Sequence, residues 1–183
     1  GTSPLDPTSN GQSKGKGELM NIALTLILGL LSVSMQNEPK LEGSFSGLIE
    51  DKALPKLEKP ASATPFGGTT FSYGVFSSQK TWSAFSKRAG KPVGKLEVDW
   101  KTEIIVYVVL QKHSNKLSFQ KWEQKSDKTG ELLFQWIPIK PFYANSVPAV
   151  LYTVSKKDLD KIVIKFSGLG AQKGELGSIK LKP

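Results

Sequence analysis

The clearest hydrophobic pattern in the chain is the unbroken run EIIVYVVL at residues 103–110. A run of β-branched and aromatic residues without polar positions predicts a central strand that is buried on both faces. Elsewhere hydrophobic and polar residues alternate, which is typical of strands with one buried face. We expect such strands at residues 45–50, 69–76, 117–122, 132–136, 149–154, 161–166 and, at the end of the chain, 178–181.

One segment, at about residues 78–89, has helical spacing instead. Trp82, Phe85 and Ala89 fall on one side of a helix, with polar residues between them, and Ser78 is a suitable N-cap. One helix among strands that are mostly joined by hairpins predicts an α+β, mainly β fold. We expect an antiparallel sheet, or a small sandwich or partial barrel, with this helix packed on it.

The first third of the chain lacks this regular patterning. Residues 1–19 are rich in Gly, Ser, Pro and Lys, which predicts a disordered segment or an extension that is not native to the protein. Residues 35–66 carry several prolines and are expected to form an extended segment. Residues 67–183 are then expected to form a single β-rich domain.

An uncharged apolar run extends from Ile22 to Leu31. At about ten residues it is half as long as a membrane-spanning helix but matches the hydrophobic region of a signal peptide. The small residues Ser32 and Ser34 follow, so we predict a signal peptide at residues 20–34 with cleavage near Ser34. The mature protein would then be periplasmic or extracellular, without a transmembrane segment. The alternative interpretation of the run is a buried N-terminal helix of the fold.

The chain has 25 Lys and Arg residues against 16 Asp and Glu, a formal net charge of +9, and Arg88 is its single arginine. Lysine is a hydrated point charge, whereas reading base edges or clamping phosphates at two points suits arginine. Sequence-specific binding to nucleic acid is therefore disfavoured. The lysines favour either a solvated surface or diffuse attraction to a polyanion such as a cell-envelope polymer.

The chain offers little catalytic chemistry, since it has no cysteine and one histidine, His113. A hydrolase triad or a histidine metal site would depend on that residue, which falls in a predicted turn. Asp158 and Asp160 alternate between lysines, which opposes cation binding. We therefore expect no enzyme, no cofactor and no metal ligand, with a hydrolase using His113 as the less favoured alternative.

The most suggestive surface feature is the cluster WIPIKPFY at residues 136–143. Prolines interrupt strand pairing there, so its aromatic side chains either anchor a loop to the core or form a recognition patch. Candidate protein-binding residues are Trp136, Phe142, Tyr143 and Tyr152. We thus expect an exported, noncatalytic protein-interaction or scaffold domain, with an envelope protein or an anionic envelope polymer as its partner.

Residues 78–166 also resemble the C-terminal domain of bacterial exported proteins of the PrcB type. The resemblance rests on SSQKTWSAF with its Trp82, on the step Val-Asp-Trp at residues 98–100, on EIIVYVVL and the hairpin after it, and on KPFY at residues 140–143. Proteins of this type stabilise a protease complex in the cell envelope. The resemblance implies a noncatalytic role in binding another protein.

Overall fold

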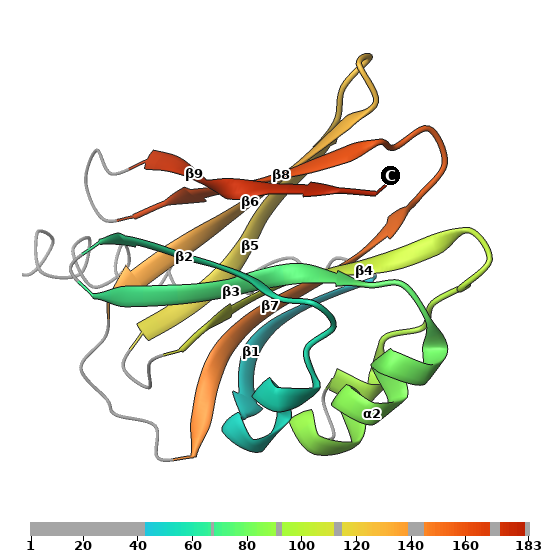
Figure 1. Ribbon diagram of the computed structural model, residues 1–183. Coiled ribbons are helices and arrows are strands. Elements are labelled where there is room, and N and C mark those ends of the chain that lie inside the picture. The colour runs from blue at the N-terminus through green and yellow to red at the C-terminus, as the bar shows by residue number, and fades with distance from the viewer. Residues whose placement is uncertain are drawn as a thin grey trace, which may run out of the picture. The chain divides into compact units, whose positions relative to one another are not determined.

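The computed structural model describes residues 43–66, 68–90, 93–111, 115–138, 145–168 and 173–181. Within these residues the chain forms two β-sheets and one α-helix, which packs on one of the sheets (Figure 1). This confirms the predicted α+β, mainly β fold with one helix. The predictions for residues 1–19 and for the signal peptide at residues 20–34 lie outside the described residues.

The first sheet, called sheet A, has five antiparallel strands with β4 at its centre. In spatial order they are β1 (Ser44–Glu50), β7 (Ser146–Ser155), β4 (Glu103–Leu110), β3 (Thr69–Phe76) and β2 (Ala61–Phe66). Every residue of β4 after Glu103 is buried, as its unbroken hydrophobic run predicted. Because both faces of sheet A are covered, its middle strand needs no polar positions.

The second sheet, called sheet B, has four strands. In spatial order they are β5 (Asn115–Gln124), β6 (Thr129–Pro138), β8 (Lys161–Ser167) and β9 (Lys173–Lys180). β5 and β6 form the expected hairpin, and β8 and β9 are antiparallel, but β6 and β8 are parallel. The parallel pair was not predicted. It arises because β7 crosses into sheet A, so that the chain re-enters sheet B in the direction of β6.

Helix α2 (Gln79–Ala89) covers the outer face of sheet A. The Ser78 hydroxyl accepts a hydrogen bond from the Thr81 N–H and caps the helix start, as expected. The helix buries Trp82 and Phe85 against Phe76, with ring centroids 5.4 and 4.8 Å apart. Two short 3-10 helices, η1 (Asp51–Lys56) and η2 (Val93–Lys95), border α2, and each adds a buried residue to this core.

A second core fills the space between the two sheets. Phe71 of β3 meets Phe134 of β6 at 5.7 Å between ring centroids, and Phe134 meets Phe166 of β8 at 6.4 Å. The alternating apolar residues of these strands, such as Ile162, Ile164 and Phe166 of β8, lie in this core. The described residues therefore form three layers: α2, sheet A and sheet B (Figure 1).

Residues 44–66, within the segment expected to be extended, supply both outer strands of sheet A. β1 pairs with β7, and β2 pairs with β3. The register of β2 shifts between Ala63 and Phe66, the stretch that contains Pro65. Proline has no N–H to donate and is tolerated on an edge strand of this kind. Among the described residues, no helix is long and apolar enough to cross a membrane.

Candidate functional site

Two of the predicted protein-binding residues are described, and both pack against the core between the sheets. The Trp136 ring lies edge-on to Phe71 at 6.4 Å, and the Tyr152 ring stacks on Phe119 at 4.4 Å. Burial raises the pKa of the Tyr152 hydroxyl. Both side chains therefore anchor their strands, although each is partly exposed.

The other predicted residues, Phe142 and Tyr143, lie outside the described residues, as does His113. The recognition surface at residues 136–143 and the hydrolase alternative thus stay predictions. Asp158 lies in an exposed turn, and the backbone of Asp160 binds Lys128 and Leu181. In the described ranges, no three His, Asp or Glu side chains gather as a metal site would require.

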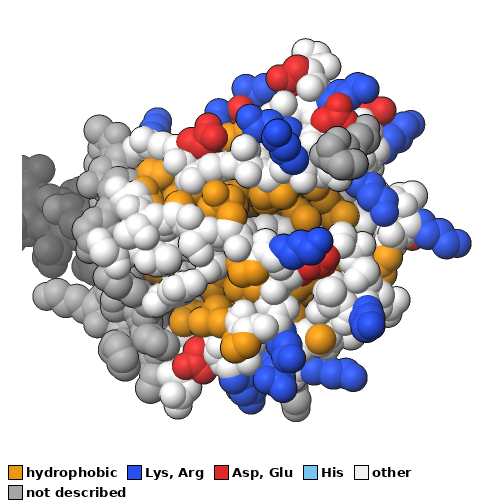
Figure 2. Space-filling view, viewed as in Figure 1, with side chains coloured by type: hydrophobic (Ala, Val, Ile, Leu, Met, Phe, Trp, Pro, Cys, Tyr) orange, Lys and Arg blue, Asp and Glu red, His pale blue; other side chains and the backbone are white. Residues whose placement is uncertain are grey.

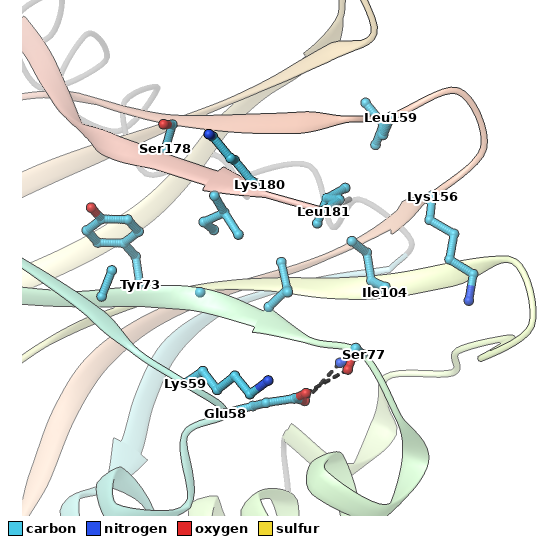
Figure 3. Close-up of a pocket in the computed structure, with 14 residues that line it drawn as sticks. Glu58, Lys59, Tyr73, Ser77, Ile104, Lys156, Leu159, Ser178, Lys180 and Leu181 are labelled. Carbon is cyan, nitrogen blue, oxygen red and sulfur yellow. Dashed lines mark hydrogen bonds between the residues drawn. The ribbon is translucent and has the colours of Figure 1, made fainter. Parts of the chain in front are cut away.

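Between the two sheets lies a pocket of about 520 Å³, called the seam groove. It lies where the end of β3 faces the end of β9, at the side of the molecule bordered by β2 (Figure 3). Its apolar wall is formed by Tyr73, Val75, Ile104, Leu159, Ile179 and Leu181. Figure 2 shows apolar side chains exposed in the seam between the sheets, with lysine side chains nearby.

One end of the seam groove is closed by Tyr73, whose side chain points toward β9 (Figure 3). Its hydroxyl approaches the backbone at Gly177 so closely that a Cβ there would collide with it. Gly177 also has a φ of +154°, a conformation that L side chains rarely adopt. A residue with a Cβ at this position would therefore clash with Tyr73 and strain the backbone.

The floor of the seam groove includes an open strand edge at Val75. Gln111 N–H donates to Thr70 O, so Thr70 and every second residue after it in β3 direct their N–H and C=O groups toward β4. Val75 is one of the residues between them, and its N–H and C=O therefore point away from β4. In β2, residue 59 would be the partner of Val75, but pairing begins only at Ala61 with Tyr73. Val75 thus presents one donor and one acceptor to the groove, and neither has a partner among the described residues.

The gap in pairing coincides with strained backbone at Lys59, which has a φ of +40°. A left-handed conformation costs about 1 kcal/mol for a residue other than glycine. Here it turns the chain out of the strand before β2 begins, so that the last part of β3 is left without a neighbour on this side. Strained residues of this kind tend to gather at functional sites.

Glu58 is the single carboxylate among the described residues of the lining, and its hydrogen bonds link separate segments of the fold. It accepts hydrogen bonds from Ser77 N–H at 2.9 Å, Ser77 Oγ at 2.6 Å and Thr81 Oγ1 at 2.6 Å (Figure 3). Burial opposes ionisation of this group, but the hydrogen bonds outweigh burial and, with Lys59 nearby, hold the pKa of Glu58 below its usual value. The carboxylate ties the start of β2 to the start of α2.

Three lysines surround the seam groove: Lys59 before β2, Lys156 after β7 and Lys180 at the end of β9 (Figure 3). Lys156 Nζ donates to Trp100 O at 3.0 Å. Lys59 and Lys180 form no ion pair with any residue that the structure describes. The described lining of the groove therefore combines an apolar wall with three ammonium groups and one engaged carboxylate.

Sequence reasoning did not find the seam groove. Its lining combines residues within 58–61, 73–77 and 178–181 with Ile104, Lys156 and Leu159, and only the packing of sheet A against sheet B brings these segments together. The sequence carries one local signal, because a glycine inside a strand, here Gly74 within residues 69–76, marks a point of close approach. It lies against the Tyr107 hydroxyl, which in turn donates to Glu58 O at 2.7 Å beside the groove.

Comparison with known proteins gives no relative. No protein-family model matches the chain, and neither a curated protein nor a solved structure shows significant similarity to it. The function must therefore be argued from the groove itself.

Proposed function

We propose that this protein is an exported, noncatalytic protein-interaction module that holds its partner in the seam groove. The observation that carries the proposal is the open edge at Val75, which faces an apolar pocket. A buried or half-buried backbone pair is normally satisfied by protein, by water or by a ligand. The N–H and C=O of Val75 have no partner among the described residues, so water or a bound molecule must satisfy them.

The groups that line the groove suit binding better than catalysis. Glu58 already accepts three hydrogen bonds, so it is a poor general base. The other charged groups among the described lining residues are lysines. Ser77 Oγ donates to Glu58, but two further hydrogen bonds to the same carboxylate and its lowered pKa make it a weak base for activating that hydroxyl. Export is proposed from the apolar run at residues 22–31, and a protein-binding role agrees with the resemblance to PrcB-type domains.

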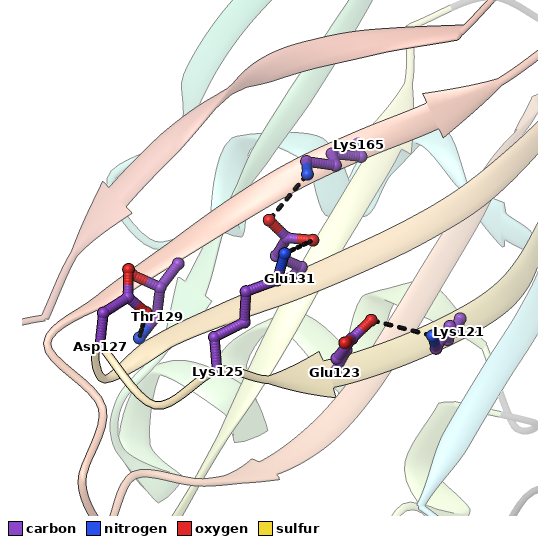
Figure 4. Close-up of polar contacts among 7 residues, drawn as sticks. All are labelled: Lys121, Glu123, Lys125, Asp127, Thr129, Glu131 and Lys165. Atoms are coloured by element: carbon purple, nitrogen blue, oxygen red, sulfur yellow. Dashed lines mark hydrogen bonds and ion pairs between the residues drawn. The ribbon is translucent and has the colours of Figure 1, made fainter.

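The lysine distribution gives less support to the alternative of a polyanion binder. On sheet B, Glu131 binds both Lys125 and Lys165, at 3.2 and 2.7 Å, and Glu123 binds Lys121 at 2.8 Å (Figure 4). These contacts neutralise part of the lysine charge on that sheet. A continuous basic surface would be expected of a protein that binds a polyanion.

Site-specific crosslinking tests the proposal. The photoreactive residue benzoylphenylalanine is placed at Lys180, beside the seam groove, and at Lys121 on sheet B as a matched exposed control. After irradiation in the exporting cell, we expect a discrete crosslinked protein from position 180 and none from position 121. Equal crosslinking from both positions, or none from either, would contradict the proposal. A third probe is placed at Trp136, and crosslinking from that position alone would move the contact surface to residues 136–143.

A further inference from the structure

We propose that the ligand of the seam groove is an extended, acidic peptide segment of the partner, which pairs its main chain with Val75. This inference rests on the proposed function, because it names the chemistry of the partner at the same site. It is argued from three properties of the groove: an open main-chain edge, an apolar wall and a surplus of positive charge.

The main-chain edge favours a peptide over other anions with apolar groups. The N–H and C=O of Val75 point to the same side of β3, where residue 59 would have supplied the complementary pair. One residue of an extended peptide supplies the same two groups at the same spacing. An acyl chain offers neither group, and covering the edge with it would cost about 1–3 kcal/mol for each unpaired group.

The apolar wall of the seam groove determines the side-chain pattern of the peptide. Successive side chains of a strand point to opposite faces, so every second side chain of the bound segment would enter the space between the sheets. That space is bordered by Ile104 of β4 and by Ile179 and Leu181 at the end of β9. Its volume of about 520 Å³ lies within the range that is usual for ligand pockets. We therefore expect apolar residues at these positions of the peptide.

The charge around the groove determines which residues the peptide should carry at its outward-facing positions. Lys59 and Lys180 lie on opposite sides of the opening, and neither is engaged in an ion pair with the described residues (Figure 3). Acidic side chains on the outward face of the peptide would meet these ammonium groups. Because such contacts are exposed, they would add selectivity and a strong dependence on salt more than affinity.

The test uses the isotopically labelled protein and short synthetic peptides, followed by amide chemical shifts. The probe is acetyl-Glu-Val-Glu-Val-Glu-amide, and the controls are its lysine counterpart, a version with N-methylated valines and sodium laurate. We expect the acidic peptide to shift the amides of residues 74–77 and 178–180. Its binding should be at least about ten-fold tighter than that of either peptide control. It should also weaken several-fold between about 0.05 and about 0.5 M salt.

Charge-reversed variants locate the site. Lys59→Glu with Lys180→Glu should reverse the preference between the acidic and the lysine peptide. The matched control is Lys80→Glu with Lys87→Glu on the exposed side of α2, which changes the net charge equally and should leave the preference unchanged. An unchanged preference in the groove variant would overturn the inference.

The remaining outcomes separate the inference from the proposed function. Absence of shifts at residues 74–77 at about 1 mM acidic peptide would overturn the inference, as would equal binding of the N-methylated peptide. Tighter binding of laurate would also overturn it, in favour of a small anion with an apolar tail. If crosslinking from position 180 still captured a protein, the proposed function would stand without the peptide. If crosslinking failed as well, both would fall.

Discussion

Tyr73 of β3 reaches across to β9 and places its hydroxyl against the backbone at Gly177. This contact joins the two sheets at one end of the seam groove, and it depends on the missing Cβ. Tyr73 itself is 7% exposed.

We expect Gly177→Ala to lower the free energy of unfolding by about 2 kcal/mol, because the new Cβ meets both the Tyr73 hydroxyl and an unfavourable φ. Urea denaturation measures the change. Gly94→Ala is the matched control, since a Cβ at Gly94 has no atom within 4 Å, and its effect should stay within about 0.5 kcal/mol. Tyr73→Phe should recover part of the loss in the double variant, and strictly additive effects would contradict the contact.

The Tyr107 hydroxyl donates to Glu58 O at 2.7 Å and crosses the gap between β4 and the chain before β2. The pKa of the Tyr107 hydroxyl is raised, mainly by burial and in smaller part by the charge of Glu58. We expect Tyr107→Phe to cost about 1–2 kcal/mol of stability, because it removes the hydrogen bond and leaves a carbonyl unpaired. Gly74 packs on the same hydroxyl, so Gly74→Ala should be tolerated better in the Tyr107→Phe background. Thermal unfolding of the four variants tests this coupling.

Glu58 makes the stability of the fold depend on pH. Its pKa in the folded state is depressed, so the stabilisation by the ionised carboxylate is present above the usual Glu pKa of 4.5 and is lost as the pH falls through the lower folded value. We expect Glu58→Gln to be less stable than the wild type at pH 7, because an amide accepts more weakly from Ser77 and Thr81. The difference should shrink below pH 4.5 in urea titrations. A difference that is constant with pH would contradict this role.

The strain at Lys59 predicts a stabilising substitution. Lys59→Gly should raise the free energy of unfolding by up to about 1 kcal/mol, because glycine adopts a positive φ without the steric penalty. Lys128, with a φ of +62°, should respond in the same direction. Lys101 lies in an exposed turn without a positive φ, so Lys101→Gly should destabilise slightly. If Lys101→Gly raised the free energy of unfolding by as much as Lys59→Gly, relief of backbone strain would not be the cause of the stabilisation.

Local patterns in the sequence were enough to predict the helix, most of the strands and their buried faces, but not β2 or the start of β9. The run at residues 103–110, the helical spacing of Trp82 and Phe85 and the alternation from Leu132 to Trp136 each depend on neighbours a few positions away. All three features occur in the structure.

Pairing between distant segments could not be predicted in the same way. The parallel pair of β6 and β8, and the approach of Tyr73 to Gly177, join residues that are far apart in the sequence. Hydrophobic periodicity reports which side of a strand is buried, but not which strand lies beside it. The seam groove depends on such long-range contacts, so the sequence alone predicts a contact surface at the aromatic cluster of residues 136–143 instead.

The positions of β1 and β2 determine how a truncated form of this protein would behave. A fragment that starts after residue 66 keeps the most regular part of the sequence but loses both outer strands of sheet A. β7 and β3, which are rich in hydrophobic residues, would then present bare hydrogen-bonding edges to other molecules. Such a fragment would tend to self-associate through these edges, so trimming before residue 67 would favour aggregation.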